Sequence, residues 1–263
     1  MKKYGLTVGL NYPNTPNELS GCVNDSNYWS EAMKKLSFDS VSQVLNENGV
    51  KTALVAQLEA NLLKAQPGDL VVFAYSGHGT LVNSMQSLVP HDFDFENSAT
   101  WLTYPELDAI MTKYEQAGVN AVCIFDSCHS KANPAIHFRY VENHTQLKNR
   151  FLEPPEYMRT KNREHLQKDR SLNADKYDIL LSGSKRNQTS ADAYINGDYH
   201  GAFTYAISLG LDRAMSQSLK ILPSYQSLIL KARAYLASEG YDQIPSVDGG
   251  SKYVNAPFFG MPH

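Results

Sequence analysis

A histidine and a cysteine stand fifty residues apart in this chain, and each follows an apolar segment. His78 comes after the run 69–75, and Cys128 comes after the run 119–125. Such near-continuous apolar runs are typical of strands in a parallel sheet that is covered on both faces. Because functional groups collect beyond the carboxyl ends of such strands, we expect His78 and Cys128 to lie close together.

These two residue types suit nucleophilic catalysis. A thiol is mostly protonated at neutral pH, so an attacking cysteine needs an imidazole that accepts its proton and later protonates the leaving amine. The backbone N–H groups of Gly79 and Cys128 are candidates for stabilising an oxyanion, since glycine lets the backbone approach closely. A lone histidine or cysteine is usually structural, as we expect for Cys123, but the paired motifs favour catalysis by His78 and Cys128.

The segments around these motifs alternate between strand and helix patterns. Besides the two apolar runs, strands are expected over 41–45 and 177–182. Helices are expected from Asn24 or Asp25, as the cap, to about Lys35, and over 52–64, 105–114, 202–215 and 225–238. This alternation predicts an α/β fold with right-handed crossovers.

The composition fits one enzyme domain. The chain has 263 residues, of which 42% are hydrophobic, enough for one large core. A formal charge of −3 disfavours nucleic acid as a partner. The start of the chain is expected to be a strand rather than a signal peptide, and no run reaches transmembrane length. Three cysteines are too few for a disulfide framework, so a cytoplasmic location is expected.

Several motifs, in this order, give the chain a resemblance to a known family, the caspase-like cysteine peptidases and among them the type I metacaspases and their prokaryotic relatives. The motifs are Gly9–Tyr12, Gly21–Asp25, Ser76–Gly79, Asp126–Ser130, Ser182–Ser184, Asn187–Asp192, Gly201–Ala206 and Gln243–Pro245. A histidine about fifty residues before the cysteine is a known rule for caspases. The resemblance implies a caspase-like fold, in which a central, mostly parallel six-stranded sheet carries helices on both faces.

The resemblance also implies one peptidase domain over 1–263. Its large-subunit-like segment is expected at 1–140, an exposed basic linker at 141–176 and a small-subunit-like segment at 177–263. The linker is either a passive solvated connection or an activation linker that the enzyme itself or another protease cuts. The possible processing sites are Arg150, Arg159, Lys161, Arg163, Lys168 and Arg170.

An acidic pocket is expected beside the nucleophile. Asp126 lies two residues before Cys128, and a partly buried carboxylate pairs best with a guanidinium. The resemblance implies that Asp25 and Asp126 are the acids that select a basic side chain, with Cys22 and Ser76 as neighbours. The alternatives are a helix cap for Asp25 and a backbone-orienting role for Asp126. We therefore expect cleavage after Arg, and more slowly after Lys.

Calcium is not expected to be needed, although many type I metacaspases require it. The acidic residues that the resemblance would supply are missing after the histidine, before the following helix and beyond the cysteine. Asp92, Asp94 and Glu96 could share one strand face, but a solvated acidic edge is the better interpretation. The histidines show no zinc spacing, so no metal or cofactor is expected.

Three classes of function are compatible with these patterns. The first is a cysteine endopeptidase acting on proteins or peptides with Arg or Lys before the scissile bond, held latent until an activating protease or another signal frees it. The second is a catalytically silent caspase-like binding or scaffold module. The third is a flavodoxin-like domain that binds small molecules, but no glycine-rich phosphate loop is present. Neither nucleic acid nor a membrane is expected as a partner, and prokaryotic members suggest a role in defence or cell death.

Overall fold

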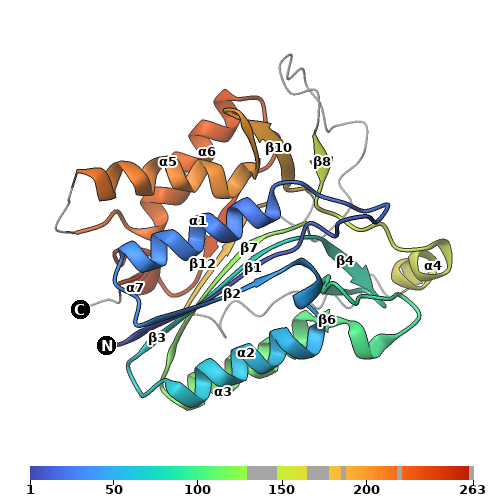
Figure 1. Ribbon diagram of the computed structural model, residues 1–263, viewed down its shortest axis with the longest axis horizontal. Helices are drawn as coiled ribbons and strands as arrows, with labels where there is room; N and C mark the ends of the chain where they lie inside the picture. The colour runs from blue at the N-terminus through green and yellow to red at the C-terminus, as the bar shows by residue number, and fades with distance from the viewer. Residues whose placement is uncertain (129–146, 165–177, 185–187, 218–220, 261–263) are drawn as a thin grey trace.

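A six-stranded sheet forms the centre of the molecule (Figure 1). The computed structural model describes residues 1–128, 147–164, 178–184, 188–217 and 221–260. The sheet order is β12-β9-β7-β3-β1-β2, and all neighbouring strands are parallel except β12, which is antiparallel to β9. The expected six-stranded, mostly parallel sheet is therefore confirmed. Its strands are β1 (Lys3–Gly9), β2 (Ser40–Leu45), β3 (Leu70–Ser76), β7 (Asn120–Asp126), β9 (Ile179–Ser182) and β12 (Ser246–Asp248).

Helices cover both faces of this sheet, which explains why its central strands are apolar throughout (Figure 1). Alternate residues of β3 enter two different cores. Val71, Phe73 and Tyr75 pack with α2 (Lys51–Lys64) and α3 (Tyr104–Gln116). Leu70, Val72 and Ala74 pack on the other side with α1 (Cys22–Lys35), α5 (Ala202–Ser216) and α6 (Tyr225–Ser238).

The register of the two central strands brings the histidine and cysteine segments to one edge of the sheet. Strands β3 and β7 pair in parallel so that Ser76 lies opposite Asp126, each the last residue of its strand. His78 and Cys128 each lie two positions beyond the end of their strand. The sheet therefore delivers both segments to the same place.

Smaller elements complete the fold beside this edge. One three-stranded sheet contains β4 (Gly79–Val82), β5 (Met85–Leu88) and β6 (Leu102–Thr103). A second contains β8 (Lys148–Asn149), β10 (Ala191–Ile195) and β11 (Asp198–Gly201). Two further helices are α4 (Glu156–Glu164) and α7 (Ser251–Val254), and single 3-10 turns lie at Asn46–Asn48 and Ser98–Thr100.

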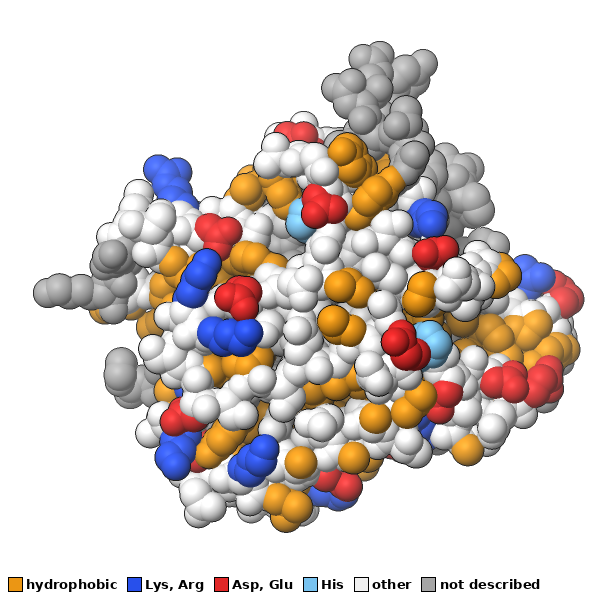
Figure 2. Space-filling model, viewed as in Figure 1, with side chains coloured by type: hydrophobic (Ala, Val, Ile, Leu, Met, Phe, Trp, Pro, Cys, Tyr) orange, Lys and Arg blue, Asp and Glu red, His pale blue; other side chains and the backbone are white. Residues whose placement is uncertain are grey.

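The expected helices are present, with one correction at the start of the first. Helix α1 begins at Cys22 with Gly21 as its N-cap, so neither Asn24 nor Asp25 caps it. In the described parts of the chain, no helix is long and apolar enough to cross a membrane. On the face seen in Figure 2, basic and acidic side chains are interspersed.

Candidate active site

The segments that follow β3 and β7 meet through their backbones. A Cβ atom placed on Gly79 would overlap the carbonyl oxygen of Cys128, so only glycine permits this approach. The adjoining His78 is 4% exposed and Cys128 is fully buried. The structure thus brings the segments of the two predicted catalytic residues into contact.

Two tyrosines fix the backbone of His78. The N–H of His78 donates to the Tyr12 hydroxyl at 3.0 Å, and the Tyr75 hydroxyl donates to the His78 carbonyl at 2.9 Å. The two hydroxyls lie 3.0 Å apart and also contact the Val89 carbonyl. All of these groups are buried, so this network holds the histidine segment rigidly.

Removing one of these hydroxyls should destabilise the fold modestly. We expect Tyr75→Phe to lower the free energy of unfolding by about 1 kcal/mol, the usual net worth of a buried hydrogen bond. The loss stays small because Tyr12 still donates to the Val89 carbonyl, and the N–H of Val89 still reaches the His78 carbonyl. Urea unfolding followed by circular dichroism measures the change, and an unaltered midpoint would show that the network contributes nothing.

The imidazole of His78 has one nitrogen bound and one free. Its Nε2 lies 2.8 Å from the carbonyl oxygen of Asn17, which can only accept a hydrogen bond, so Nε2 carries the proton. Its Nδ1 is buried and has no hydrogen-bond partner among the described residues. Burial lowers the pKa of His78 to about 4, although the Asn17 carbonyl opposes this effect. The ring is therefore neutral near pH 7, with Nδ1 available as a base.

The thiol of Cys128 is also neutral at rest. Burial raises its pKa well above the usual value, an effect that the Ser190 backbone and Arg150 only partly oppose. The N–H of Ser190 lies 2.7 Å from Sγ, and the Ser190 carbonyl oxygen lies 3.3 Å from it. The resting pair is thus a thiol and a neutral imidazole rather than an ion pair.

Three buried carboxylates surround one buried guanidinium. In Arg150, Nη2 lies 2.8 Å from Asp25 and 2.9 Å from Asp192, while Nη1 lies 3.3 Å from Asp126. Nη1 also donates to the backbone carbonyl of Asp126 at 3.1 Å and to the Ser76 hydroxyl at 3.4 Å. All three acids and Arg150 are at most 1% exposed. Asp25 and Asp126, the two acids that the sequence analysis singles out, thus lie together, and the space among the carboxylates, here called the acidic pocket, is filled by a side chain of the same protein.

Backbone N–H groups hold each carboxylate from behind. Asp126 accepts from the N–H of Thr204 in the first turn of α5 at 2.9 Å. Asp192 accepts from the N–H groups of Ser20 and Gly21, just before α1, at 2.7 and 2.9 Å. Asp25 accepts from the N–H of Gly201 and from the Ser76 hydroxyl, both at 2.9 Å. Helix N-termini carry partial positive charge, which helps a pocket of three acids and one cation to stay buried.

The charge of Asp25 is finely balanced. Burial raises the pKa of its carboxyl to about 7, and Arg150 is the largest influence that lowers it. The guanidinium of Arg150 therefore favours the charged form of the Asp25 carboxyl, against the effect of burial.

The backbone of Arg150 is held as firmly as its side chain. Its carbonyl oxygen accepts from the N–H groups of Gly79 at 2.9 Å and Cys128 at 3.2 Å, and its N–H donates to the Ser190 carbonyl at 3.1 Å. Before it, β8 pairs antiparallel with β10; after it, the N–H of Leu152 donates to the Gly79 carbonyl at 2.9 Å. The segment Lys148–Leu152 thus lies across the site in extended pairing on both sides of the Arg150–Phe151 bond.

The prediction of an exposed linker is wrong at Arg150, which is fully buried because three acids compensate its charge. Arg159 lies in α4 and pairs with Glu153 and Glu156. Lys161 and Arg163 lie in the same helix, and their side chains are outside the described residues. Lys168 and Arg170 are wholly outside them.

The other predicted pocket residues lie at the same place. Ser76 contacts both Asp25 and Arg150, and the fully buried Cys22 lies close enough to the pocket that its acids and Arg150 influence the pKa of its thiol. Burial is nevertheless the main influence on that thiol, and it raises the pKa. Asp25 faces the pocket instead of capping α1.

Sequence reasoning missed Asp192 and Ser190. Both lie in or beside β10, outside the central sheet, where a strand-end rule does not apply. Ser190 bonds the Asp126 carboxylate through its hydroxyl at 2.5 Å and contacts the Cys128 thiol through its backbone. The only available signal was the acid at the end of the 187–192 motif.

The described residues contain no group of three His, Cys, Asp or Glu side chains arranged to hold a metal ion. The carboxylate of Asp92 accepts from the N–H of Lys51 at the start of α2, and that of Asp94 accepts from the N–H of Glu96. These acids thus make local hydrogen bonds to the backbone.

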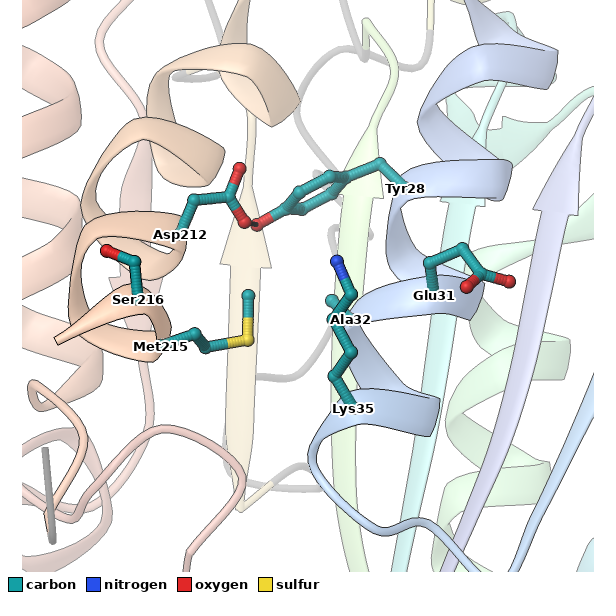
Figure 3. A pocket seen from close by; sticks show the side chains of 7 residues that line it. All are labelled: Tyr28, Glu31, Ala32, Lys35, Asp212, Met215 and Ser216. Carbon is teal, nitrogen blue, oxygen red and sulfur yellow. Dashed lines mark hydrogen bonds between the residues drawn. The ribbon is translucent and has the colours of Figure 1, made fainter. Parts of the chain in front are cut away.

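A separate surface hollow of about 440 Å³ lies between α1 and α5, on the sheet face that these two helices cover (Figure 3). The Tyr28 hydroxyl donates to Asp212 at 3.2 Å across it. No residue of the acidic pocket lines this hollow. It is lined by Tyr28, Glu31, Ala32, Lys35, Asp212, Met215 and Ser216.

A sheet that is covered on both faces, with histidine and cysteine segments beyond adjacent strands, is the arrangement expected of a caspase-like protein. Comparison of the sequence with known protein families agrees. The model of the caspase domain matches residues 2–252, so this chain belongs to that family. It is similar to metacaspase-1 of Kluyveromyces lactis, with 28% identity over 94% of the chain and 65% of that relative. It is also similar to metacaspase-5 of Trypanosoma cruzi, with 28% identity over 92% of the chain and 56% of the relative. The chain thus spans roughly half to two thirds of the length of these curated relatives.

Solved structures show the same fold. A protein from Geobacter sulfurreducens superposes with a TM-score of 0.70 at 22% identity, covering 100% of both chains. The Drosophila initiator caspase Dronc gives a TM-score of 0.58 at 11% identity, over 97% of this chain and 81% of its own. Both likenesses concern the fold alone. One relative, 27% identical over 95% of this chain and 72% of its own, is named inactive metacaspase-4 of Trypanosoma brucei brucei.

Proposed function

We propose that this protein is a cysteine endopeptidase that cleaves after Arg, and more slowly after Lys, using Cys128 as nucleophile and His78 as acid and base. One observation carries the proposal: an arginine lies with its guanidinium among three carboxylates and with its carbonyl oxygen on the N–H groups of Gly79 and Cys128. This is how a substrate residue before the scissile bond would bind. Membership of the caspase domain family supports the same class of chemistry.

The groups on the site define the steps. The free Nδ1 of His78 takes the proton of the Cys128 thiol, and the sulfur attacks the substrate carbonyl carbon. The N–H groups of Gly79 and Cys128, which hold the Arg150 carbonyl oxygen, stabilise the oxyanion that forms. The imidazole then gives its proton to the leaving amine, which leaves a thioester that water hydrolyses to a carboxylate, restoring the thiol.

The pocket favours arginine over lysine for geometric reasons. The two terminal nitrogens of Arg150 contact three carboxylates from three separate segments. A planar guanidinium can satisfy several oxygens at fixed directions, whereas an ammonium is a single point of charge. Acidic side chains are excluded, because they would be buried against like charges.

The enzyme is further proposed to act without calcium or any cofactor, and to be regulated by cutting of the 141–176 segment or by an upstream activator. The few acids near the histidine segment, and the local hydrogen bonds that they make, support independence from calcium. Addition of a chelator should leave turnover unchanged, and a strong loss that calcium restores would refute this part of the proposal.

A silent binding module is the second candidate, since one relative is named inactive. An enzyme is favoured instead by the free Nδ1 of His78, the buried thiol of Cys128 and the two N–H donors on one carbonyl oxygen.

Peptides that differ only in the residue before the cut, which is Arg, Lys, citrulline or Asp, provide the test. They should be applied to the wild type, to Arg150→Ala, which leaves the pocket free, and to Cys128→Ala. We expect Cys128→Ala to have lost hydrolysis of the Arg peptide. The silent module would be favoured if the wild type and Arg150→Ala both fail to hydrolyse the peptides and if an Arg chloromethyl ketone labels Cys128 in neither of them.

Affinity for Arg should rise as the pH is raised above 7. With Arg150 in place the pKa of Asp25 is about 7, and because the guanidinium lowers it, the same carboxyl in an empty pocket has a higher pKa. Between these two values, Arg binding releases a proton and strengthens with pH; below the lower value, the carboxyl is protonated with or without Arg. KM for an Arg peptide should therefore fall through this window. Asp25→Asn should abolish the fall, and a KM that is flat above pH 7 in the wild type would contradict the argument.

A further inference from the structure

We infer that the Arg150–Phe151 peptide bond is the enzyme's own cleavage site and that it is cut within the same molecule. This inference rests on the proposed peptidase activity and adds its first substrate. Of the six basic residues that the sequence offers as processing sites, it selects one.

Hydrogen bonds hold this bond from both sides, as a bound substrate would be held. On the amino side, Asp192 pairs with Lys148 and Ala191 with Asn149, so β8 adds an antiparallel strand to β10. At the centre, the Arg150 carbonyl oxygen lies on the N–H groups of Gly79 and Cys128. On the carboxyl side, Leu152 donates to the Gly79 carbonyl and accepts at its own carbonyl from the Thr80 hydroxyl at 2.7 Å. Strand addition of this kind is a common way to bind an extended peptide.

The other described basic residues of the segment are unsuited to the role. Arg159 lies within α4, where a helical backbone cannot extend across the site, and its guanidinium pairs with Glu153 and Glu156. Lys148 is exposed and its ammonium reaches the Glu18 carbonyl at 2.7 Å. Among the basic residues described in this segment, Arg150 alone is seated among carboxylates with its carbonyl on the two N–H donors.

The proposed reaction balances as a peptide hydrolysis. The Cys128 sulfur bonds to the Arg150 carbonyl carbon, its proton passes through His78 to the nitrogen of Phe151, and the C–N bond breaks. Water then opens the thioester and leaves a carboxylate on Arg150 and an amine on Phe151. No oxidant, metal or co-reactant is needed.

Burial makes the reaction intramolecular. The side chain of Arg150 is fully buried in its own pocket, so a second molecule cannot reach it without unseating it. The same seating keeps other Arg residues out of the pocket until the bond is cut. Hydrolysis of an added peptide should therefore begin after a lag that matches the appearance of the new end at Phe151.

The test follows the full-length chain by intact-mass measurement and amino-terminal sequencing. We expect fragments that end at Arg150 and begin at Phe151, formed with the same half-time across a wide range of protein concentration. Arg150→Lys should be cut more slowly and Arg150→Gln not at all, whereas the matched variant Arg159→Gln should be cut like the wild type. Cys128→Ala keeps the whole pocket and should remain intact even when active enzyme is added.

The outcomes separate this inference from the proposed function. The inference is overturned if the wild type or Arg150→Ala hydrolyses Arg peptides while the Arg150–Phe151 bond of the wild type stays intact. The proposed peptidase activity would then still hold. Ready cleavage of Cys128→Ala at Arg150 by added enzyme, with half-times that shorten at higher concentration, overturns the intramolecular step. Absence of peptide hydrolysis and of active-site labelling in both proteins refutes the peptidase itself.

Discussion

Replacement of Asp25 by asparagine is expected to lower kcat/KM for an Arg peptide by about 100-fold or more. The carboxylate lies 2.8 Å from the buried guanidinium of Arg150, in the place that we assign to a substrate arginine. Removing one partner of a buried ion pair costs about 3–5 kcal/mol, and each 1.4 kcal/mol corresponds to about a factor of ten. The pocket then holds the guanidinium with two carboxylates instead of three.

A citrulline peptide identifies the cause of that loss, because citrulline has nearly the shape of arginine without its charge. Asp25→Asn should reduce Arg hydrolysis far more than citrulline hydrolysis. Asp198→Asn is the matched control: this exposed acid of β11 accepts a hydrogen bond from the N–H of its neighbour Tyr199, and it lies outside the pocket. Equal losses for the two peptides would mean that Asp25 supports the fold rather than selects the substrate.

A methyl group on Gly79 is expected to reduce kcat by about 100- to 1000-fold, the usual effect of losing an oxyanion donor. A Cβ atom there would overlap the carbonyl oxygen of Cys128, and both atoms belong to backbone that cannot swing aside. Relief of the overlap moves the N–H groups of Gly79 and Cys128 apart, although both must point at one oxygen.

Measurement of Gly79→Ala requires proof that the protein is folded. Circular dichroism and alkylation of Cys128 should show an intact fold and an available thiol, while turnover of Arg peptides and self-cleavage fall together. Gly250→Ala is the control, because a Cβ there meets only Tyr253 at 3.4 Å, an ordinary contact. Near-normal turnover in Gly79→Ala would remove the two N–H groups from the mechanism.

The sequence predicts the central sheet and the residues at its edge because both obey a local rule. Apolar runs covered on two faces become parallel strands, and residues just beyond their ends meet. His78, Gly79, Asp126 and Cys128 all follow from this rule. Asp25 required the family resemblance, since in isolation it is also a plausible helix cap.

The remaining parts of the site depend on contacts between distant segments. The carboxylate of Asp192 reaches the start of α1 across more than 170 positions of the chain, and no periodic pattern encodes that contact. The burial of Arg150 is equally hidden, because a run of basic residues normally indicates a solvated segment. Only the assembled pocket, with acids from α1, β7 and β10, reverses that expectation.

Under the self-cleavage that we infer, the seating of Arg150 makes the maturation of this protein depend on the same pocket as its selectivity. The cavity that would choose among foreign peptides also receives residue 150 of its own chain. Redesign of the cavity for a neutral or acidic side chain should therefore also prevent cleavage of the uncut chain after Arg150. Such a redesign needs a matching substitution of residue 150. Laboratory selection for a new specificity should therefore yield variants that carry both the cavity substitutions and a substitution at position 150.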